Sequence, residues 1–241
     1  MPRFYCPQAL AAGATIALPA TVAHHASVVR LQPGAALTLF NGDGSEYTAR
    51  LASLDNRSAT AELIERRERD CELPFAVTLA QALPEGTKMD WIIEKAVELG
   101  VTAIEPLAAQ RSVVKLSAER AEKRHAHWQA VIVAAAEQCG RNRIAALAPV
   151  APLAAWLAAP AAAPRLLFSP RATLSLADWA SDGGARAVCL MVGPEGGFSD
   201  EEEDAAVQSG AIRLSIGPRV LRTETAALAA LAALCALWGG M

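Results

Sequence analysis

The 241-residue sequence lacks any apolar run near the roughly 20 residues that a membrane-spanning helix requires. Its longest such run, 226–238, fits a buried helix instead. No basic flank followed by an apolar stretch opens the chain, so no secretory signal peptide is expected. The five cysteines lie far apart, and none of them pairs at the spacing of a metal site. These features favour a cytoplasmic protein with reduced thiols, no membrane segment and no bound metal.

An excess of basic charge is also missing. The formal net charge is −3 and only 20% of the residues are charged, which argues against a protein coated with positive charge for nucleic acid. One segment differs, because residues 111–143 contain seven lysine or arginine residues and three glutamates. A polyanion would contact this segment, although a solvated helix face held by ion pairs explains the same pattern.

Several familiar catalytic motifs do not occur. The sequence contains no G-x-G-x-x-G, G-x-S-x-G, H-E-x-x-H or C-x-x-C motif. Their absence counts against a nicotinamide enzyme on a doubly wound sheet, and against the common hydrolase, metalloprotease and zinc-site classes. Aromatic residues make up only 5% of the chain, and Trp91 and Trp128 fall in predicted helices, where core packing is more common than stacking on bases.

Residues 1–72 are predicted to form a first domain of short strands. Asn41 to Gly44 is a strong turn signal between two apolar or alternating segments. The charge run 65–70 is interpreted as a solvated strand end that leads into a linker closing at Pro74. The predicted strands are 35–40, 46–54 and 58–64, with a helix near 22–31.

Residues 73–241 are predicted to form a second, α/β domain. Apolar runs alternate with helical periods, which is typical of a parallel sheet covered by helices on both faces. The predicted strands are 76–82, 103–106, 144–148, 165–168, 187–192 and 212–216, and the predicted helices are 86–99, 117–139, 153–158, 174–180, 200–209 and 225–238.

A first glycine-bearing loop, Val192 to Phe198, follows a strongly apolar predicted strand. A helix then begins at Ser199, and the acidic residues of its first turn oppose the binding of a phosphate. Glycines in this position let the backbone approach a flat or uncharged ligand closely. A tight strand-to-helix turn explains the same residues without any ligand.

A second loop, 215–226, follows the last predicted strand and opens the last helix. Thr223 or Thr225 could cap that helix, and Arg222 and Glu224 lie beside its start. A capped helix with a surface ion pair would account for these residues. However, the carboxyl ends of neighbouring parallel strands meet at one edge of a sheet, so the two loops together predict a shared binding crevice.

Taken together, these loops and other segments resemble the 16S ribosomal RNA uridine-N3 methyltransferase family, RsmE, of the SPOUT class. The similar segments are Gly193 to Phe198, Gly217 to Ala226, Lys88 to Gly100, Arg111 to Val113, Ala136 to Arg141 and Arg3 to Tyr5. The resemblance therefore covers essentially the whole chain. One departure is Ala145, where the family pattern has a proline.

The resemblance implies a fold, a reaction and partners. It implies a SPOUT-type parallel sheet with a C-terminal trefoil knot, preceded by a small PUA-like β-barrel that positions RNA, and a homodimer. The implied reaction is methylation of N3 of a uridine in 16S rRNA of the small ribosomal subunit, with S-adenosylmethionine (SAM) as cofactor. A SPOUT enzyme acting on another rRNA or tRNA position, and a non-catalytic RNA-binding protein, are the alternatives.

The resemblance also implies roles for particular residues. Arg222 would stabilise negative charge on the uracil carbonyls, and Glu224 would orient Arg222 or act as the base. The residues expected to bind the cofactor are Val192, Gly193, Glu195, Gly197, Ile216, Gly217, Leu221, Thr225 and Ala226. Those expected to contact RNA phosphates are Arg3, Arg111, Lys115, Lys123, Arg124 and Arg141.

Overall fold

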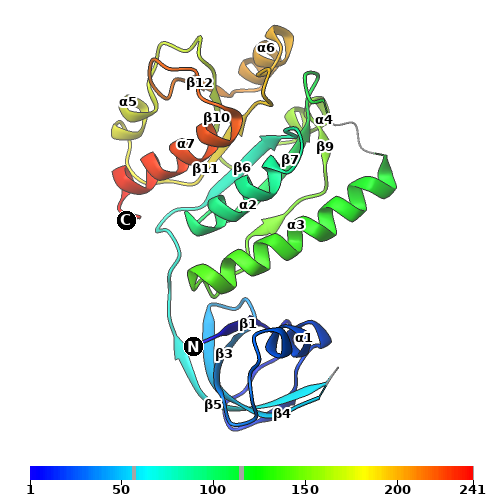
Figure 1. The fold of residues 1–241 in the computed structure, drawn as a ribbon. Coiled ribbons are helices and arrows are strands. Elements are labelled where there is room, and N and C mark those ends of the chain that lie inside the picture. Colours follow the sequence, from blue (N-terminus) through cyan, green and yellow to red (C-terminus); the bar gives the residue numbers. More distant parts are fainter. Residues whose placement is uncertain (56–57, 114–116, 241) are drawn as a thin grey trace. The chain divides into compact units, whose positions relative to one another are not determined.

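A computed structural model describes residues 1–55, 58–113 and 117–240, and the chain divides into two compact units. The first unit is Met1–Glu72 together with Ala136–Ile144, and the second is Leu73–Ala135 together with Ala145–Met241. Each unit is described by itself (Figure 1).

The first unit is built on a five-stranded sheet with the strand order β1-β3-β4-β5-β2. Its elements are β1 (Arg3–Tyr5), β2 (Thr15–Ala17), α1 (Ala20–Val28), β3 (Ala36–Phe40), β4 (Ser45–Leu54) and β5 (Ala59–Glu68). β3, β4 and β5 are antiparallel neighbours, and β1 runs parallel to β3. Alternate side chains of β4 and β5, among them Leu51 and Leu63, point into one apolar core with Phe4 and Leu39.

The predicted strands of this unit are all present. β5 continues to Glu68, so the charge run does form a strand end. β1 and β2 were not predicted, because three residues are too few to show an alternating pattern. These two strands lie at the ends of the sheet path, and its closure into a barrel stays a prediction.

The segment 136–144 joins the first unit, although the sequence assigned it to the second domain. The amide of Asn142 donates to the carbonyl of Arg69 over 3.0 Å, and the backbone N–H of Tyr5 donates to the Glu137 carboxylate over 2.8 Å. Side chains from a distant part of the sequence thus complete this unit. Their partners cannot be deduced from sequence spacing.

The second unit is an α/β structure on a seven-stranded sheet. All its strand pairs are parallel, in the order β12-β10-β11-β6-β7-β8, with β9 also pairing with β7. The strands are β6 (Val77–Ala82), β7 (Ala103–Ala108), β8 (Ala146–Leu147), β9 (Ala151–Pro152), β10 (Arg165–Phe168), β11 (Val188–Val192) and β12 (Ile212–Leu214). The helices are α2 (Lys88–Glu98), α3 (Ala118–Cys139), α4 (Leu153–Ala158), α5 (Leu176–Ser181), α6 (Asp200–Gln208) and α7 (Thr223–Trp238).

Both faces of this sheet are covered, as the sequence predicts. Ala80 of β6 and Met191 of β11 share one core with Leu153 of α4 and Ala206 of α6. On the opposite side α7 contacts β6 and β11 and packs against α2 and α5 (Figure 1). Residues pointing to either face are therefore buried, and in the central strand β11 (Val188–Val192) all five residues are apolar and buried.

Within the residues that the structure describes, no helix has the length and apolar character needed to cross a bilayer. The same residues contain no group of three or more His, Cys, Asp or Glu side chains placed to hold a metal ion. All five cysteines are free thiols.

Candidate functional site

A cavity of about 450 Å³ opens where β10, β11 and β12 end. These strands are parallel neighbours, so their carboxyl ends meet at one edge of the sheet. The volume lies in the range of small-molecule sites. Of the residues predicted to bind a cofactor, those that line the cavity are Val192, Gly193, Glu195, Gly197, Ile216, Gly217, Leu221 and Ala226.

Gly193 owes its identity to the tightness of the loop after β11. A Cβ at this position would lie 2.9 Å from the amide nitrogen of Phe198 and 3.0 Å from the Cα of Gly197. Both atoms belong to the backbone, so rotation of a side chain cannot relieve the clash. The tight-turn explanation therefore holds for Gly193, whereas Gly217, with a φ of +101°, faces open space.

Replacing Gly193 by alanine is expected to lower the free energy of unfolding by about 1–3 kcal/mol, because overpacked backbone has to shift. Denaturant unfolding measures this. Gly196→Ala is the matched control, since its Cβ would first meet the Cδ of Arg111 at 3.4 Å. Equal losses from the two variants would contradict the steric argument.

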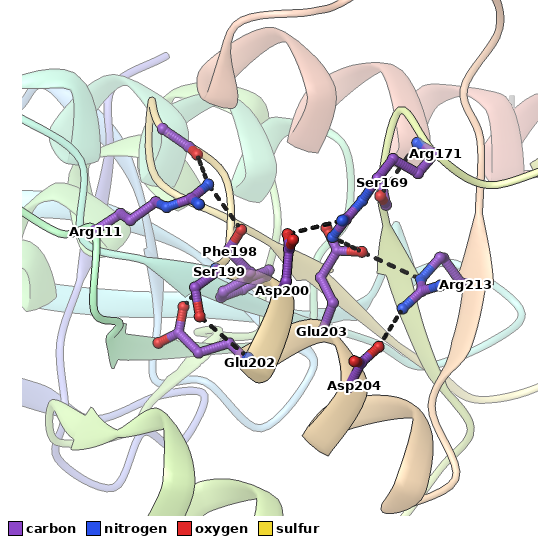
Figure 2. Close-up of polar contacts among 11 residues, drawn as sticks. Arg111, Ser169, Arg171, Phe198, Ser199, Asp200, Glu202, Glu203, Asp204 and Arg213 are labelled. Carbon is purple, nitrogen blue, oxygen red and sulfur yellow. Dashed lines mark hydrogen bonds and ion pairs between the residues drawn. The ribbon is translucent and has the colours of Figure 1, made fainter.

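The helix that follows this loop begins with a capping box. The Ser199 hydroxyl accepts from the backbone N–H of Glu202, and the Glu202 carboxylate accepts from the backbone N–H of Ser199. Arg111 donates to the carbonyls of Gly196 and Phe198 over 2.9 and 3.2 Å (Figure 2). Arg111 thus holds the loop and lies on the cavity wall.

Thr223 links three segments beneath the cavity. Its buried hydroxyl donates to the carbonyl of Gly193 over 2.6 Å and accepts from the amide of Gln81 over 2.9 Å. The predicted capping role is wrong for Thr223 and Thr225, since Arg222 is the N-cap residue and makes no side-chain capping bond. Thr223 instead ties the start of α7 to the ends of β6 and β11.

A lysine and two glutamates lie beside the same loops. Lys88 forms an ion pair with Glu195, whose carboxylate also accepts from the backbone N–H of Glu85 over 3.1 Å. The Glu195 hydrogen bond raises the pKa of Lys88 most strongly, and the charge of Glu224 raises it further. One carboxylate oxygen of Glu224 is buried and has no hydrogen-bond partner among the described residues.

The two predicted catalytic residues flank the cavity and are not among its lining residues. Arg222 is exposed at the start of α7, and Glu224 is half-buried in the first turn of that helix. Thr225 is exposed and also lies outside the lining. The roles assigned to these residues stay predictions.

Two of the predicted phosphate contacts are engaged within the first unit. Arg3 pairs with Glu46 over 2.6 Å, and its side chain is 13% exposed. Arg141 is only 4% exposed and forms an ion pair with Glu72. Carboxylates distant in sequence thus pair with both guanidinium groups, and the expected phosphate contacts of Arg3 and Arg141 stay predictions.

The remaining predicted phosphate contacts lie in the second unit. Lys123 is exposed on α3 and pairs with Glu119 one turn away over 2.6 Å, as expected for a solvated helix face. Arg124 is half-exposed on the same helix. Lys115 lies outside the described residues.

Sequence reasoning missed the loop after β10. Ser169, Pro170 and Arg171 also line the cavity. This loop carries no glycine signal, although its strand was predicted and lies between β11 and β12.

The two tryptophans that were expected in a core differ in their exposure. Trp91 is 46% exposed, whereas Trp128 is buried and its indole N–H donates to the carboxylate of Asp90 over 3.0 Å.

Comparisons with known proteins agree along the whole chain. Residues 71–235 match the family described as RNA methyltransferase domain, and residues 18–64 match the one described as RNA methyltransferase PUA domain. A ribosomal RNA small subunit methyltransferase E of Synechocystis is 35% identical, over 93% of this chain and 74% of the relative.

Two solved structures are also similar. The ribosomal RNA small subunit methyltransferase E of Neisseria gonorrhoeae bound to SAM is 40% identical, with a TM-score of 0.91 over 99% of this chain and 98% of its own. A methyltransferase of Legionella pneumophila in complex with SAM is 36% identical, with a TM-score of 0.92 over 97% and 96%. The sequence, the sheet-edge cavity and these likenesses lead to one conclusion: the chain belongs to the RNA methyltransferase family that contains the ribosomal RNA small subunit methyltransferase E (RsmE) proteins.

Proposed function

We propose that this protein transfers a methyl group from SAM to N3 of a uridine in the 16S rRNA of the small ribosomal subunit. The observation that carries the proposal is the cavity at the ends of β10, β11 and β12, whose lining includes every residue predicted to bind the cofactor except Thr225. Two similar structures are described as bound to SAM, and the similar relatives are named for small-subunit rRNA.

The cavity suits SAM rather than a nucleotide phosphate. Ile216 and Leu221 offer apolar surface, and the glycine loops offer backbone groups for a neutral purine and ribose. The acidic first turn of α6 opposes a phosphate. When bound, SAM supplies an electrophilic methyl group.

The side chains of this protein must then accept the N3 proton of the target base and stabilise the negative charge that its removal leaves. Uridine N3 carries a proton, and its removal leaves negative charge on the uracil carbonyls. Glu224, with a buried carboxylate oxygen that no described donor satisfies, is proposed as the base or as the group that orients Arg222. Arg222 is proposed to stabilise the carbonyl charge, on a base unstacked from the RNA.

The finer expectations of fold and location belong to this proposal as well. A trefoil knot, a homodimer and a cytoplasmic location are proposed. α7 supports the dimer, because it is apolar around its circumference, with Leu231 and Leu234 buried and Leu237 47% exposed. Arg111, Lys123 and Arg124 are the proposed RNA contacts, with the first unit positioning the RNA.

Methyl transfer from labelled SAM to purified small ribosomal subunits that lack this modification tests the proposal. Nucleoside analysis is expected to give labelled 3-methyluridine at a single site. Binding of SAM with label appearing only in tRNA or at another rRNA position would favour the alternative substrates. A folded protein that binds SAM weakly or not at all, with no transfer, would contradict the proposal.

A further inference from the structure

We infer that Arg171 and Asp200 form the receptor for the α-amino acid end of the cofactor, with the Arg171 guanidinium binding the carboxylate and Asp200 binding the ammonium group. The inference rests on the proposed function, since it assigns a subsite within the same cavity. It assigns to the loop after β10 a role in binding.

The geometry of the pair carries the inference (Figure 2). Arg171 and Asp200 both line the cavity, and their side chains meet over 2.7 Å. Both are open to solvent, at 50% and 71% exposure. An exposed ion pair of this kind contributes little stability, so a ligand can separate its members at small cost.

A buried carboxylate holds Arg171 in place. Glu203 is 7% exposed and lies 2.9 Å from an Nη of Arg171. The backbone N–H of Arg171 also donates to the hydroxyl of Ser169 over 3.2 Å. The guanidinium has five N–H donors, so it can keep Glu203 and still present others to a carboxylate in the cavity.

Arg213 also forms an ion pair with Glu203. It lies 3.2 Å from the same Glu203 oxygen and 3.3 Å from Asp204, and it is not among the lining residues (Figure 2). Charges therefore alternate along the row Asp200, Arg171, Glu203, Arg213 and Asp204. Asp200, Arg171 and Glu203 all line the cavity, but Glu203 is buried, so Asp200 and Arg171 form the exposed ion pair of the row at the cavity wall.

The cofactor matches this division of the wall. Its purine and ribose are neutral and suit the glycine loops after β11 and β12, whereas its α-amino acid end carries one negative and one positive charge. A zwitterion placed between Arg171 and Asp200 gives each charge an opposite neighbour. The acidic start of α6, unsuitable for phosphate, then serves to bind an ammonium group.

Two nucleosides isolate this contribution. S-adenosylhomocysteine and methylthioadenosine are both uncharged at sulfur, and they differ by the α-amino acid end. Calorimetry gives their dissociation constants for the wild type, which is expected to bind S-adenosylhomocysteine at least about tenfold more tightly.

Arg171→Gln and Asp200→Asn are each expected to raise the dissociation constant of S-adenosylhomocysteine by about threefold to tenfold. The dissociation constant of methylthioadenosine is expected to stay within about twofold of the wild-type value. Arg213→Gln is the matched control, because it also removes one guanidinium from Glu203 but lies off the cavity wall. It is expected to change neither affinity by more than about twofold. Thermal unfolding confirms the fold of each variant, and the exposed Asp200 carries the test if Arg171→Gln does not fold.

If Arg171→Gln lowered the affinity for both nucleosides equally, the inference would be overturned, and Arg171 would be a residue that positions the loop. Unchanged selectivity in a folded Asp200→Asn variant would also overturn it. A folded wild type that binds neither nucleoside nor SAM would instead refute the proposed function, on which the inference depends.

Discussion

Replacing Glu224 by glutamine is expected to lower methyl-transfer turnover by about 10²–10⁴-fold, the usual contribution of a positioned general base, if Glu224 has the proposed role. Glutamine keeps the size of the side chain but cannot accept the N3 proton. Affinity for SAM stays within about twofold, because Glu224 is not among the cavity-lining residues. Arg222→Ala is expected to lower turnover by about 10²–10³-fold, because the negative charge on the uracil carbonyls would then lack its proposed cationic partner.

Single-turnover assays with small ribosomal subunits, paired with calorimetric binding of SAM, measure both effects. Glu201→Gln is the control, because Glu201 is likewise a glutamate in the first turn of a helix after a cavity loop, but it is exposed. Near-normal turnover of Glu224→Gln would remove Glu224 from the mechanism. Loss of SAM binding in parallel with turnover would reassign it to the cofactor site.

The second large effect is expected on the free energy of unfolding, when the ion pair between Arg141 and Glu72 is removed. Arg141→Gln is expected to lower the free energy of unfolding by about 3–5 kcal/mol, because it leaves the largely buried carboxylate of Glu72 without its guanidinium partner. Denaturant unfolding followed by a probe in the first unit measures the loss.

Lys123→Gln is the matched control for this variant. It removes the same charge from the neighbouring part of the sequence, yet Lys123 is 75% exposed. Its effect is expected to stay within about 0.5 kcal/mol. Similar small effects from both variants would show that Arg141 contributes little to stability, and would restore it as a candidate phosphate contact.

Strong local patterns made much of the second unit predictable. β11 is a continuous apolar run and β6 is a largely apolar one, and the structure places both in the middle of the parallel sheet. β9, with two residues, was missed because it is too short to show a period. The unit bounds could not be fully predicted, since 136–144 continues a helix whose partners are remote.

The candidate site was predictable where glycine marked it. The loops after β11 and β12 carry glycines, and both line the cavity. The loop after β10 has no such signal, so Arg171 was missed. The ion pairs of Arg3 and Arg141 could not be predicted, because their carboxylate partners lie 43 and 69 positions away in the sequence.

The first unit is made of two separate segments of the sequence, and this limits how genetic recombination can exchange it between relatives. A genetic crossover between residues 72 and 73 would carry the strands of the unit but leave Glu137, Arg141 and Asn142 behind. Tyr5, Glu72 and Arg69 would then lose the partners found here. A functional exchange of the first unit between relatives needs three cuts within one gene, which favours the descent of both units as a single block. The first unit and the parallel sheet of the second unit are therefore expected to diverge together rather than to be exchanged separately.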